Sequence, residues 1–574
     1  MLRRFVDRVS SFDALSAGAV AAASVLLAFA VAGPVVELAG LPGRLIVFAV
    51  VMALQISRRV PRGPLRGRLL ALATLPVVAV VTALLGELMR HDRGAADVLV
   101  VAATAGSFAT RRAPPAIARV GRLLSVPVVV LFVTPVPGGV RGGEIGWYLL
   151  LSLVAGACVL GADRRLGGAA AERAVRAAIR RFPRQARAAA GSAARFRRSA
   201  VELDTEIAAR APDEDAAPLR LALLEAELAA TEAAADLDGA LARLARTAAS
   251  TPLGGGGTAP QDAGPGESRL RPGPTTRVVV HAAVAMALAL AISQRLYPDR
   301  WSWTVVSVLA ISGGLRSRGD VLLRSGERLL GALAGTFVAT LLADAVGGNR
   351  AVSIVVILAL IAAGSVLREV TYASWAFCVT SALALLYGLY GERGSHLLGE
   401  RLVQNVIGAA CVIVPSYFLL PVRTEAVVRR RVASVLSALD DLLATLAEGA
   451  PAVQLTESTR AVDRRRAALE DAVRPAAVQG RVLRAFRREP PRAVRLAAAV
   501  GATDDAARPL VYGALTEGTR PSRATLGALR RSLGSTRRAL GGRRSEAPPP
   551  LPDASGDGAQ LDRALRGLHD ALTL

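Results

Sequence analysis

Two arginines in the stretch RSRGDVLLRSGERLLGALAGTFVATLLA, residues 316–343, lie where a polar loop gives way to a long apolar run. If the run is helical, Arg324, Arg328, Gly331 and Gly335 follow spacings of four, three and four residues and share one face. A guanidinium group carried into a membrane-spanning helix can attract an anion, because charges interact strongly at low dielectric constant. The alternative is that both arginines reach back to lipid phosphates and only orient the helix.

A second group of polar residues occurs in ERLVQNVIGAAC, residues 400–411. At helical spacing, Arg401, Asn405 and Gly408 share a face, and Gln404 lies beside them. Trp303 begins another apolar segment, where it either anchors the helix at the membrane interface or stacks on an aromatic substrate. We therefore expect an anion path lined by Arg324, Arg328, Arg401, Gln404, Asn405 and Trp303. Gly331, Gly335 and Gly408 are expected to let neighbouring helices pack closely.

The elements that would position these residues are twelve apolar segments. The chain has 574 residues, of which 52% are hydrophobic, and a mean hydropathy of +0.41, which is typical of membrane proteins. The segments lie near 14–33, 44–57, 68–89, 95–110, 122–135, 145–162, 277–294, 301–314, 327–346, 351–367, 371–390 and 398–421. Six segments in each half predict an all-α integral membrane protein of two parallel six-helix repeats, with about 12 spans.

The second segment of each half, 44–57 and 301–314, is short. A helix of about 14 residues covers roughly 21 Å of a hydrocarbon core about 30 Å thick. Short segments at matching places in two repeats indicate a transport site. The alternative is that tilted or irregular ends extend both helices across the bilayer.

The distribution of arginine predicts the orientation. A net charge of +24 is compatible with nucleic-acid binding or with a membrane surface. Five arginines gather in 58–68, a predicted cytoplasmic loop, whereas the predicted outer loop 34–43 has none. Because basic loops stay in the cytoplasm, we expect a multi-pass protein of the inner (plasma) membrane with both termini cytoplasmic and no nucleic-acid partner.

The domain organisation follows from these segments. We expect a first transmembrane repeat at 1–162, a cytoplasmic helical block at 163–250 and a flexible Gly/Pro linker at 251–276. A second transmembrane repeat follows at 277–422. The C-terminal block at 423–574 is expected to be helical and cytoplasmic, with a disordered stretch near 541–560.

The stretch YPDRWSWTVVSVLAISGGLRSRGDVLLRSGERLLGALAG, together with GERLVQNVIGAAC, resembles the fusaric-acid-resistance-like (FUSC) family of aromatic acid exporters. Arg328, Gly331, Gly335, Arg401 and Gly408 match the pattern of that family. Three positions depart from it: Ala332 and Asn405 replace threonines, and Gln404 replaces an aspartate. The missing carboxylate weakens any role for position 404 in proton relay.

The resemblance implies an exporter of organic or aromatic acids, with the lipid bilayer and a small organic anion as partners. Two alternatives are a non-transporting membrane scaffold whose cytoplasmic helices recruit partners, and a lipid-handling membrane protein. The sequence contains no nucleotide-binding loop, metal-ligand cluster or nucleophile–base pattern, so we expect neither an enzyme nor a cofactor. Assembly into a homo-oligomer is left open.

Overall fold

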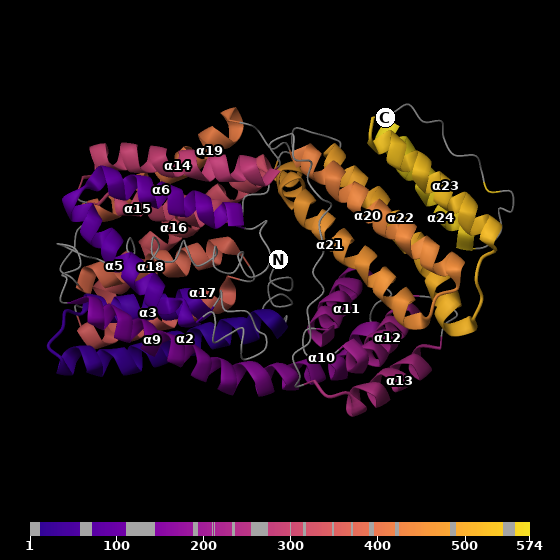
Figure 1. Ribbon diagram of the computed structural model, residues 1–574, viewed down its shortest axis with the longest axis horizontal. Helices are drawn as coiled ribbons and strands as arrows, with labels where there is room; N and C mark the ends of the chain where they lie inside the picture. The colour runs from indigo at the N-terminus through magenta and orange to yellow at the C-terminus, as the bar shows by residue number, and fades with distance from the viewer. Residues whose placement is uncertain are drawn as a thin grey trace. The chain divides into compact units, whose positions relative to one another are not determined.

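The chain forms two compact units of helices (Figure 1). Unit 1 comprises Met1–Ala171 and Glu267–Val422, and unit 2 comprises Glu172–Gly266 and Arg423–Leu574. The computed structural model describes residues 12–57, 72–110, 144–187, 193–208, 211, 213–231, 236–253, 274–298, 300–313, 317–346, 349–368, 371–389, 395–419, 424–482, 490–542, 551 and 557–573. Throughout these residues the regular secondary structure is helical.

Unit 1 contains the apolar helices. In the first half these are α2 (Phe12–Leu38), α3 (Arg44–Ser57), α5 (Leu75–His91), α6 (Arg93–Ala109) and α9 (Ile145–Ala162). In the second half they are α14 (Pro274–Leu296), α15 (Ser302–Ser312), α16 (Arg318–Val346), α17 (Arg350–Leu367), α18 (Tyr372–Leu389) and α19 (Ser395–Phe418). Most of them run roughly parallel in Figure 1, while α5 crosses obliquely from α6 towards α3 and α9.

Six helices among the described residues are long and apolar enough to cross a membrane. They are Gly18–Leu38, Ile145–Leu166, Thr276–Leu296, Arg350–Leu367, Tyr372–Leu389 and Gly399–Phe418, and α3 and α15 are apolar but shorter. This supports the predicted class of all-helical membrane protein. The predicted segment 122–135 lies outside the described residues, so the count of twelve spans stays a prediction.

Several buried hydroxyl groups in unit 1 are satisfied within their own helices. The side chains of Ser24, Thr82 and Thr104 donate to the carbonyl oxygens four residues earlier, at 2.6, 2.7 and 2.8 Å. Such bonds allow a polar residue to be buried in an apolar helix without a partner on another helix. Polar side chains that pair between helices therefore stand out.

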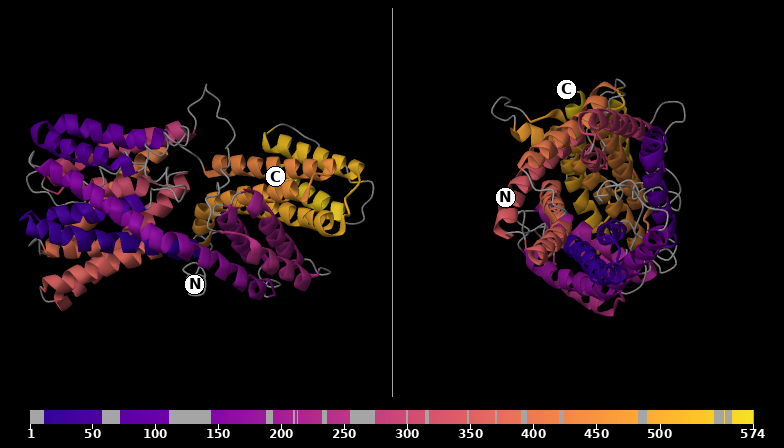
Figure 2. Two further views of the ribbon diagram at one scale, coloured as in Figure 1. Left: turned by 60° about the horizontal axis from the view of Figure 1, so that its bottom comes forward. Right: turned by 90° about the vertical axis from the view of Figure 1, so that its left-hand side faces the viewer.

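The helices of the two halves have corresponding neighbours. α2, α3 and α9 pack on one another, and so do α14, α15 and α19. α5 packs on α9 as α16 packs on α19, while α2 contacts α17 and α14 contacts α6. Figure 1 shows α14 beside α6, and in Figure 2 the indigo and purple helices of the first half lie among the pink and orange helices of the second half. Each helix of the first half thus has a counterpart with the same contacts in the second half, as far as the described residues extend.

Unit 2 combines helices from the two predicted cytoplasmic blocks. It contains α10 (Ala169–Arg187, which begins at the end of unit 1), α11 (Ala193–Ala208), α12 (Asp213–Ala229), α13 (Leu237–Ser250), α20 (Thr424–Glu448), α21 (Ala452–Val482), α22 (Arg492–Tyr512), α23 (Arg523–Leu540) and α24 (Asp557–Thr573). Two π-helical turns, η3 (Asp163–Gly168) and η6 (Gly513–Glu517), precede α10 and follow α22.

Some predicted boundaries in these blocks need correction. Most of the predicted linker and most of the stretch near 541–560 lie outside the described residues. α14 already begins at Pro274 and α24 at Asp557, so helix extends into the ends of both ranges.

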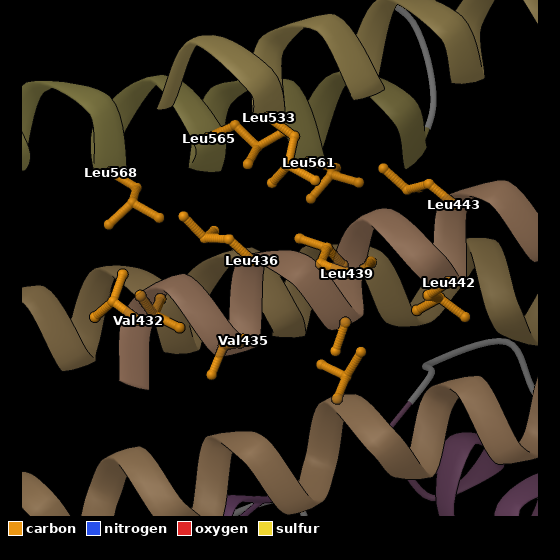
Figure 3. Packing of buried hydrophobic residues seen from close by; sticks show 14 of the residues in the cluster. Val432, Val435, Leu436, Leu439, Leu442, Leu443, Leu533, Leu561, Leu565 and Leu568 are labelled. Carbon is orange, nitrogen blue, oxygen red and sulfur yellow. The ribbon is translucent and has the colours of Figure 1, made fainter. Parts of the chain in front are cut away.

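The core of unit 2 is formed by leucines at helical spacing. Leu436 and Leu439 of α20 face Leu561, Leu565 and Leu568 of α24 across the bundle (Figure 3). All of these leucines are buried, and this apolar burial stabilises the bundle.

A buried network of ion pairs joins α12 to α21 and α22. Arg460 is fully buried and donates to Glu227 at 2.6 Å and to Asp463 at 3.0 Å. Arg508 also donates to Glu227, at 2.7 Å, and pairs with Asp463. Because Glu227 comes from the first block and both arginines come from the second, the two blocks, predicted as separate domains, share one interior.

Candidate functional site

The candidate site lies where the short helix α15 packs against α19. Gly408 makes this contact close, since a Cβ atom there would lie 2.8 Å from the Cβ of Ser307 and 3.0 Å from the carbonyl oxygen of Thr304. Only a residue without a side chain fits at this distance. The two backbones therefore approach closely enough for short polar side chains to meet.

Two pairs of polar side chains join α15 to α19. The hydroxyl of Thr304 donates to Oε1 of Gln404 at 3.2 Å, and the hydroxyl of Ser307 lies 2.6 Å from Oδ1 of Asn405. Thr304, Ser307, Gln404 and Asn405 are all buried, and Nε2 of Gln404 has no hydrogen-bond partner within the described part of the chain. A buried amide donor of this kind is costly unless another group meets it.

Arg401 lies one turn before these pairs and is held between two aromatic rings. Its Cζ atom lies 4.8 Å from the ring centroid of Trp303 and 5.1 Å from that of Tyr387 in α18. The two rings meet edge to face at 5.4 Å, and the indole N–H of Trp303 donates to the Tyr387 hydroxyl at 3.1 Å. Arg401 is only 7% exposed. The rings fix a permanent positive charge in a largely buried position.

α16 carries the other predicted arginines. Arg328 is only 6% exposed, and its Nε atom has no hydrogen-bond partner among the residues that the structure describes. Cζ of Arg324 lies 5.3 Å from the ring of Tyr372 in α18. The Tyr372 hydroxyl and the Ser325 hydroxyl also lack hydrogen-bond partners in the described part of the chain. α16 therefore carries a buried guanidinium group and the unsatisfied hydroxyl of Ser325, and α18 carries the unsatisfied hydroxyl of Tyr372 beside Arg324.

The two glycines that follow Arg328 bring α16 against α18. A Cβ atom at Gly331 would lie 2.4 Å from the carbonyl oxygen of Ala373, and one at Gly335 would lie 2.6 Å from that of Phe377. The Ser381 hydroxyl donates to the carbonyl oxygen of Gly335 at 2.9 Å. The seam that the sequence places next to Arg328 is thus a close contact between two helices.

The predicted site residues fall into two groups. Trp303, Arg401, Gln404 and Asn405 lie together at the contact of α15 with α19, whereas Arg324 and Arg328 lie on α16. The contacts described above lie within each group: Arg401 packs against the ring of Trp303, and Arg324 packs against that of Tyr372.

Sequence reasoning missed three residues of the site: Thr304, Ser307 and Tyr387. Thr304 and Ser307 are three residues apart within an otherwise apolar helix, and this spacing could have identified them as a polar face. Tyr387 gives no such signal, because its partners Trp303, 84 residues before it, and Arg401 lie on two other helices.

These features define an α-helical membrane protein of several spans, with fixed charge and paired polar groups buried between its helices. Residues 284–414 match the family described as fusaric acid resistance protein-like. That range therefore forms a domain of this family, and the resemblance predicted from the sequence is confirmed. The domain contains every residue of both groups. No curated protein and no solved structure matches the chain.

Proposed function

We propose that this protein is a transporter that exports organic acids, including aromatic carboxylic acids, from the cytoplasm across the inner (plasma) membrane. The observation that carries the proposal is the guanidinium group of Arg401, buried between Trp303 and Tyr387 beside two polar pairs between helices. The family match to a resistance protein also supports membrane transport.

The electrostatics favour an anion as substrate. A charged side chain at membrane depth is costly, and such residues usually face a cavity or an ion path. A carboxylate near Arg401 would gain Coulomb attraction at low dielectric constant, and the free amide N–H of Gln404 could donate to it. The faces and edges of Trp303 and Tyr387 offer apolar contact to an aromatic ring on the same molecule.

A second binding position is proposed at Arg328. Its buried guanidinium and the unsatisfied hydroxyls of Ser325 and Tyr372 could together bind a carboxylate. In the proposed topology α16 begins at the cytoplasmic side and α19 begins at the outer side. Arg328 would then receive the anion from the cytoplasm, and Arg401 would hold it closer to the exit.

The proposed layout is twelve spans in two parallel repeats, with both termini and unit 2 in the cytoplasm. A single shift of 256 residues supports it, since this shift carries Arg44 to Arg300 and Glu144 to Glu400. The corresponding helix neighbours support it as well.

Reporter fusions test the topology. Fusions placed after Arg141 and after Glu392 should give an outside signal, and a fusion at the C-terminus should give an inside signal. An inside signal at either internal position would contradict the twelve-span layout.

Export is tested with a strain that lacks the protein. Such a strain should become more sensitive to weak aromatic acids, and cells preloaded with benzoate should lose it more slowly. The full-length chain should restore export, whereas Arg401→Gln at equal membrane abundance should not. Restoration of export by Arg401→Gln would show that this buried charge does not bind the substrate. Equal sensitivity and equal benzoate loss in the strains with and without the protein would instead favour the scaffold or lipid-handling alternatives.

A further inference from the structure

The two halves of unit 1 can be compared residue by residue through a pair of corresponding ion pairs. Arg44 at the start of α3 pairs with Glu144, the residue before α9, at 2.6 Å. Arg300 just before α15 pairs with Glu400 in α19 at 3.3 Å. In both cases the partners are 100 positions apart. The same shift therefore aligns both helices of each contact.

Further residues match under this shift. The N-cap of α6 is Asp92, whose carboxylate accepts from the backbone N–H of Ala95 at 3.0 Å. The N-cap of α17 is Asn349, whose amide oxygen accepts from Ala351 at 3.0 Å. Under the same shift, Asp92 and Asn349 correspond to within one residue, so the alignment of the two halves extends beyond the ion pairs.

The counterpart of the candidate site in the first half is apolar. The shift carries Trp303, Thr304 and Ser307 back to Val47, Phe48 and Val51 of α3. It also carries Arg401, Gln404 and Asn405 back to Ile145, Tyr148 and Leu149 of α9. All six first-half residues belong to, or pack against, one hydrophobic cluster.

An aromatic pair occupies the place of the first polar pair. Phe48 and Tyr148 meet edge to face, with their ring centroids 4.6 Å apart, where the second half has the hydrogen bond from Thr304 to Gln404. Both aromatic residues are almost fully buried. An anion brought to this contact would lose its hydration against two aromatic rings, and the nearby guanidinium group of Arg44 is already paired with Glu144.

The ion pair beside this contact is also more enclosed. The side chains of Arg44 and Glu144 are 15% and 13% exposed, against 33% and 32% for Arg300 and Glu400. The shorter and more buried pair adds a charge-assisted link to a contact that is already apolar. The α3–α9 contact is thus built to stay closed.

We propose that the chain has one anion path, which opens at the α15–α19 contact, and that the α3–α9 contact is a sealed copy that braces unit 1. This inference rests on the transport function proposed above and assigns the two halves different roles. Three first-half residues keep the α3–α9 contact closed. Phe48 and Tyr148 fill the space that Thr304 and Gln404 occupy in the second half, and Ile145 stands where the second half has the charge of Arg401.

Two cysteine variants of the full-length chain at matched positions test the proposal. Ser307→Cys and Val51→Cys place a thiol at the same position of the two contacts, and both changes are small. Membrane vesicles carrying each variant are treated with the anionic reagent sulfonatoethyl methanethiosulfonate. The cysteine thiolate attacks the sulfenyl sulfur, forms a mixed disulfide and releases methanesulfinate. The parent chain, treated in parallel, gives the reaction rate of the three native cysteines, all of them buried, and this rate is subtracted.

We expect Ser307→Cys to react at least about tenfold faster than Val51→Cys, because local opening limits the reaction of a buried thiol. Intact-mass measurement over time gives both rates. Similar rates at the two positions would overturn the sealed copy while leaving the transport function standing. Reaction at neither position would instead overturn the anion path, and this inference with it. Asn405→Cys and Leu149→Cys form a second matched pair, which decides the question if either first variant fails to reach the membrane.

Discussion

Replacement of Arg401 by glutamine removes the buried charge on which the proposed function depends. The guanidinium lies 4.8 and 5.1 Å from two ring centroids, so its position is fixed before a substrate arrives. At an effective dielectric constant near 20, a carboxylate about 4 Å away gains on the order of 4 kcal/mol before desolvation. If a third to a half of that gain survives desolvation, the loss is roughly 1.4–2 kcal/mol, which corresponds to about a 10- to 30-fold weaker affinity.

The assay is the initial rate of benzoate uptake into inside-out vesicles, measured over a range of concentrations. We expect Arg401→Gln to raise the KM by about 10- to 30-fold at equal membrane abundance. The KM of Arg401→Lys should lie between those of Arg401→Gln and the parent chain, because lysine retains the charge but lacks the planar group that lies against the rings.

Arg300→Gln is the matched control. Arg300 lies at the start of the same α15–α19 contact, where it pairs with Glu400, but its side chain is 33% exposed. An exposed pair of this kind contributes about 0–1 kcal/mol, so the KM should change by less than about fivefold. If Arg401→Gln behaves like Arg300→Gln, the buried charge does not bind the substrate and the site assignment is wrong.

Three further predictions concern other buried charges. Arg328→Gln should lower benzoate transport by about tenfold while Arg318→Gln has a smaller effect, because Arg328 is buried whereas Arg318 is only partly buried and already donates to the carbonyl oxygen of Tyr417; equal rates in vesicles would contradict a binding role. Arg460→Leu should lower the free energy of unfolding of unit 2 by about 3–5 kcal/mol, because it removes one of the two guanidinium groups that neutralise the buried carboxylates of Glu227 and Asp463. Hydrogen exchange in α12 and α21 measures this loss, and Arg530→Leu, which breaks an exposed pair, should cost no more than about 1 kcal/mol. Burial would raise the pKa of Glu227, but the neighbouring guanidinium groups outweigh it and hold the pKa below its usual range. The stabilisation is thus present above the ordinary pKa of a glutamate and is lost as the pH falls through the lowered value, so Glu227→Gln should flatten the acid-induced loss of protection in α12.

The ion-pair network also bears on how unit 2 should be tested. Each block follows the last apolar segment of one half, and Glu227 and Arg460 bring the two blocks into one interior. Deletion of either block would leave buried charges of the other without partners. Point variants are therefore a better test of unit 2 than truncation.

The sequence by itself determined the class of the protein and much of the candidate site. Apolar runs of membrane length specify spanning helices, because the backbone must satisfy its hydrogen bonds internally in lipid. Helical spacing was enough to group Arg401 with Gln404, Asn405 and Gly408, since residues three and four positions apart must share a face. The ion pairs Arg44–Glu144 and Arg300–Glu400 are also visible in the sequence as two equal separations.

Only the tertiary structure decided which faces meet. Tyr387 joins Arg401 and Trp303 because α18 packs near α15 and α19, and the contact between Arg460 and Glu227 spans 233 residues. No local pattern encodes such partners, because the position and angle of each helix depend on how the whole set of side chains packs. For the same reason, the sequence did not predict that the α15–α19 contact is polar while the corresponding α3–α9 contact is apolar. Phe48 and Tyr148 are ordinary apolar residues in the sequence, and only their contact identifies them as the counterpart of Thr304 and Gln404.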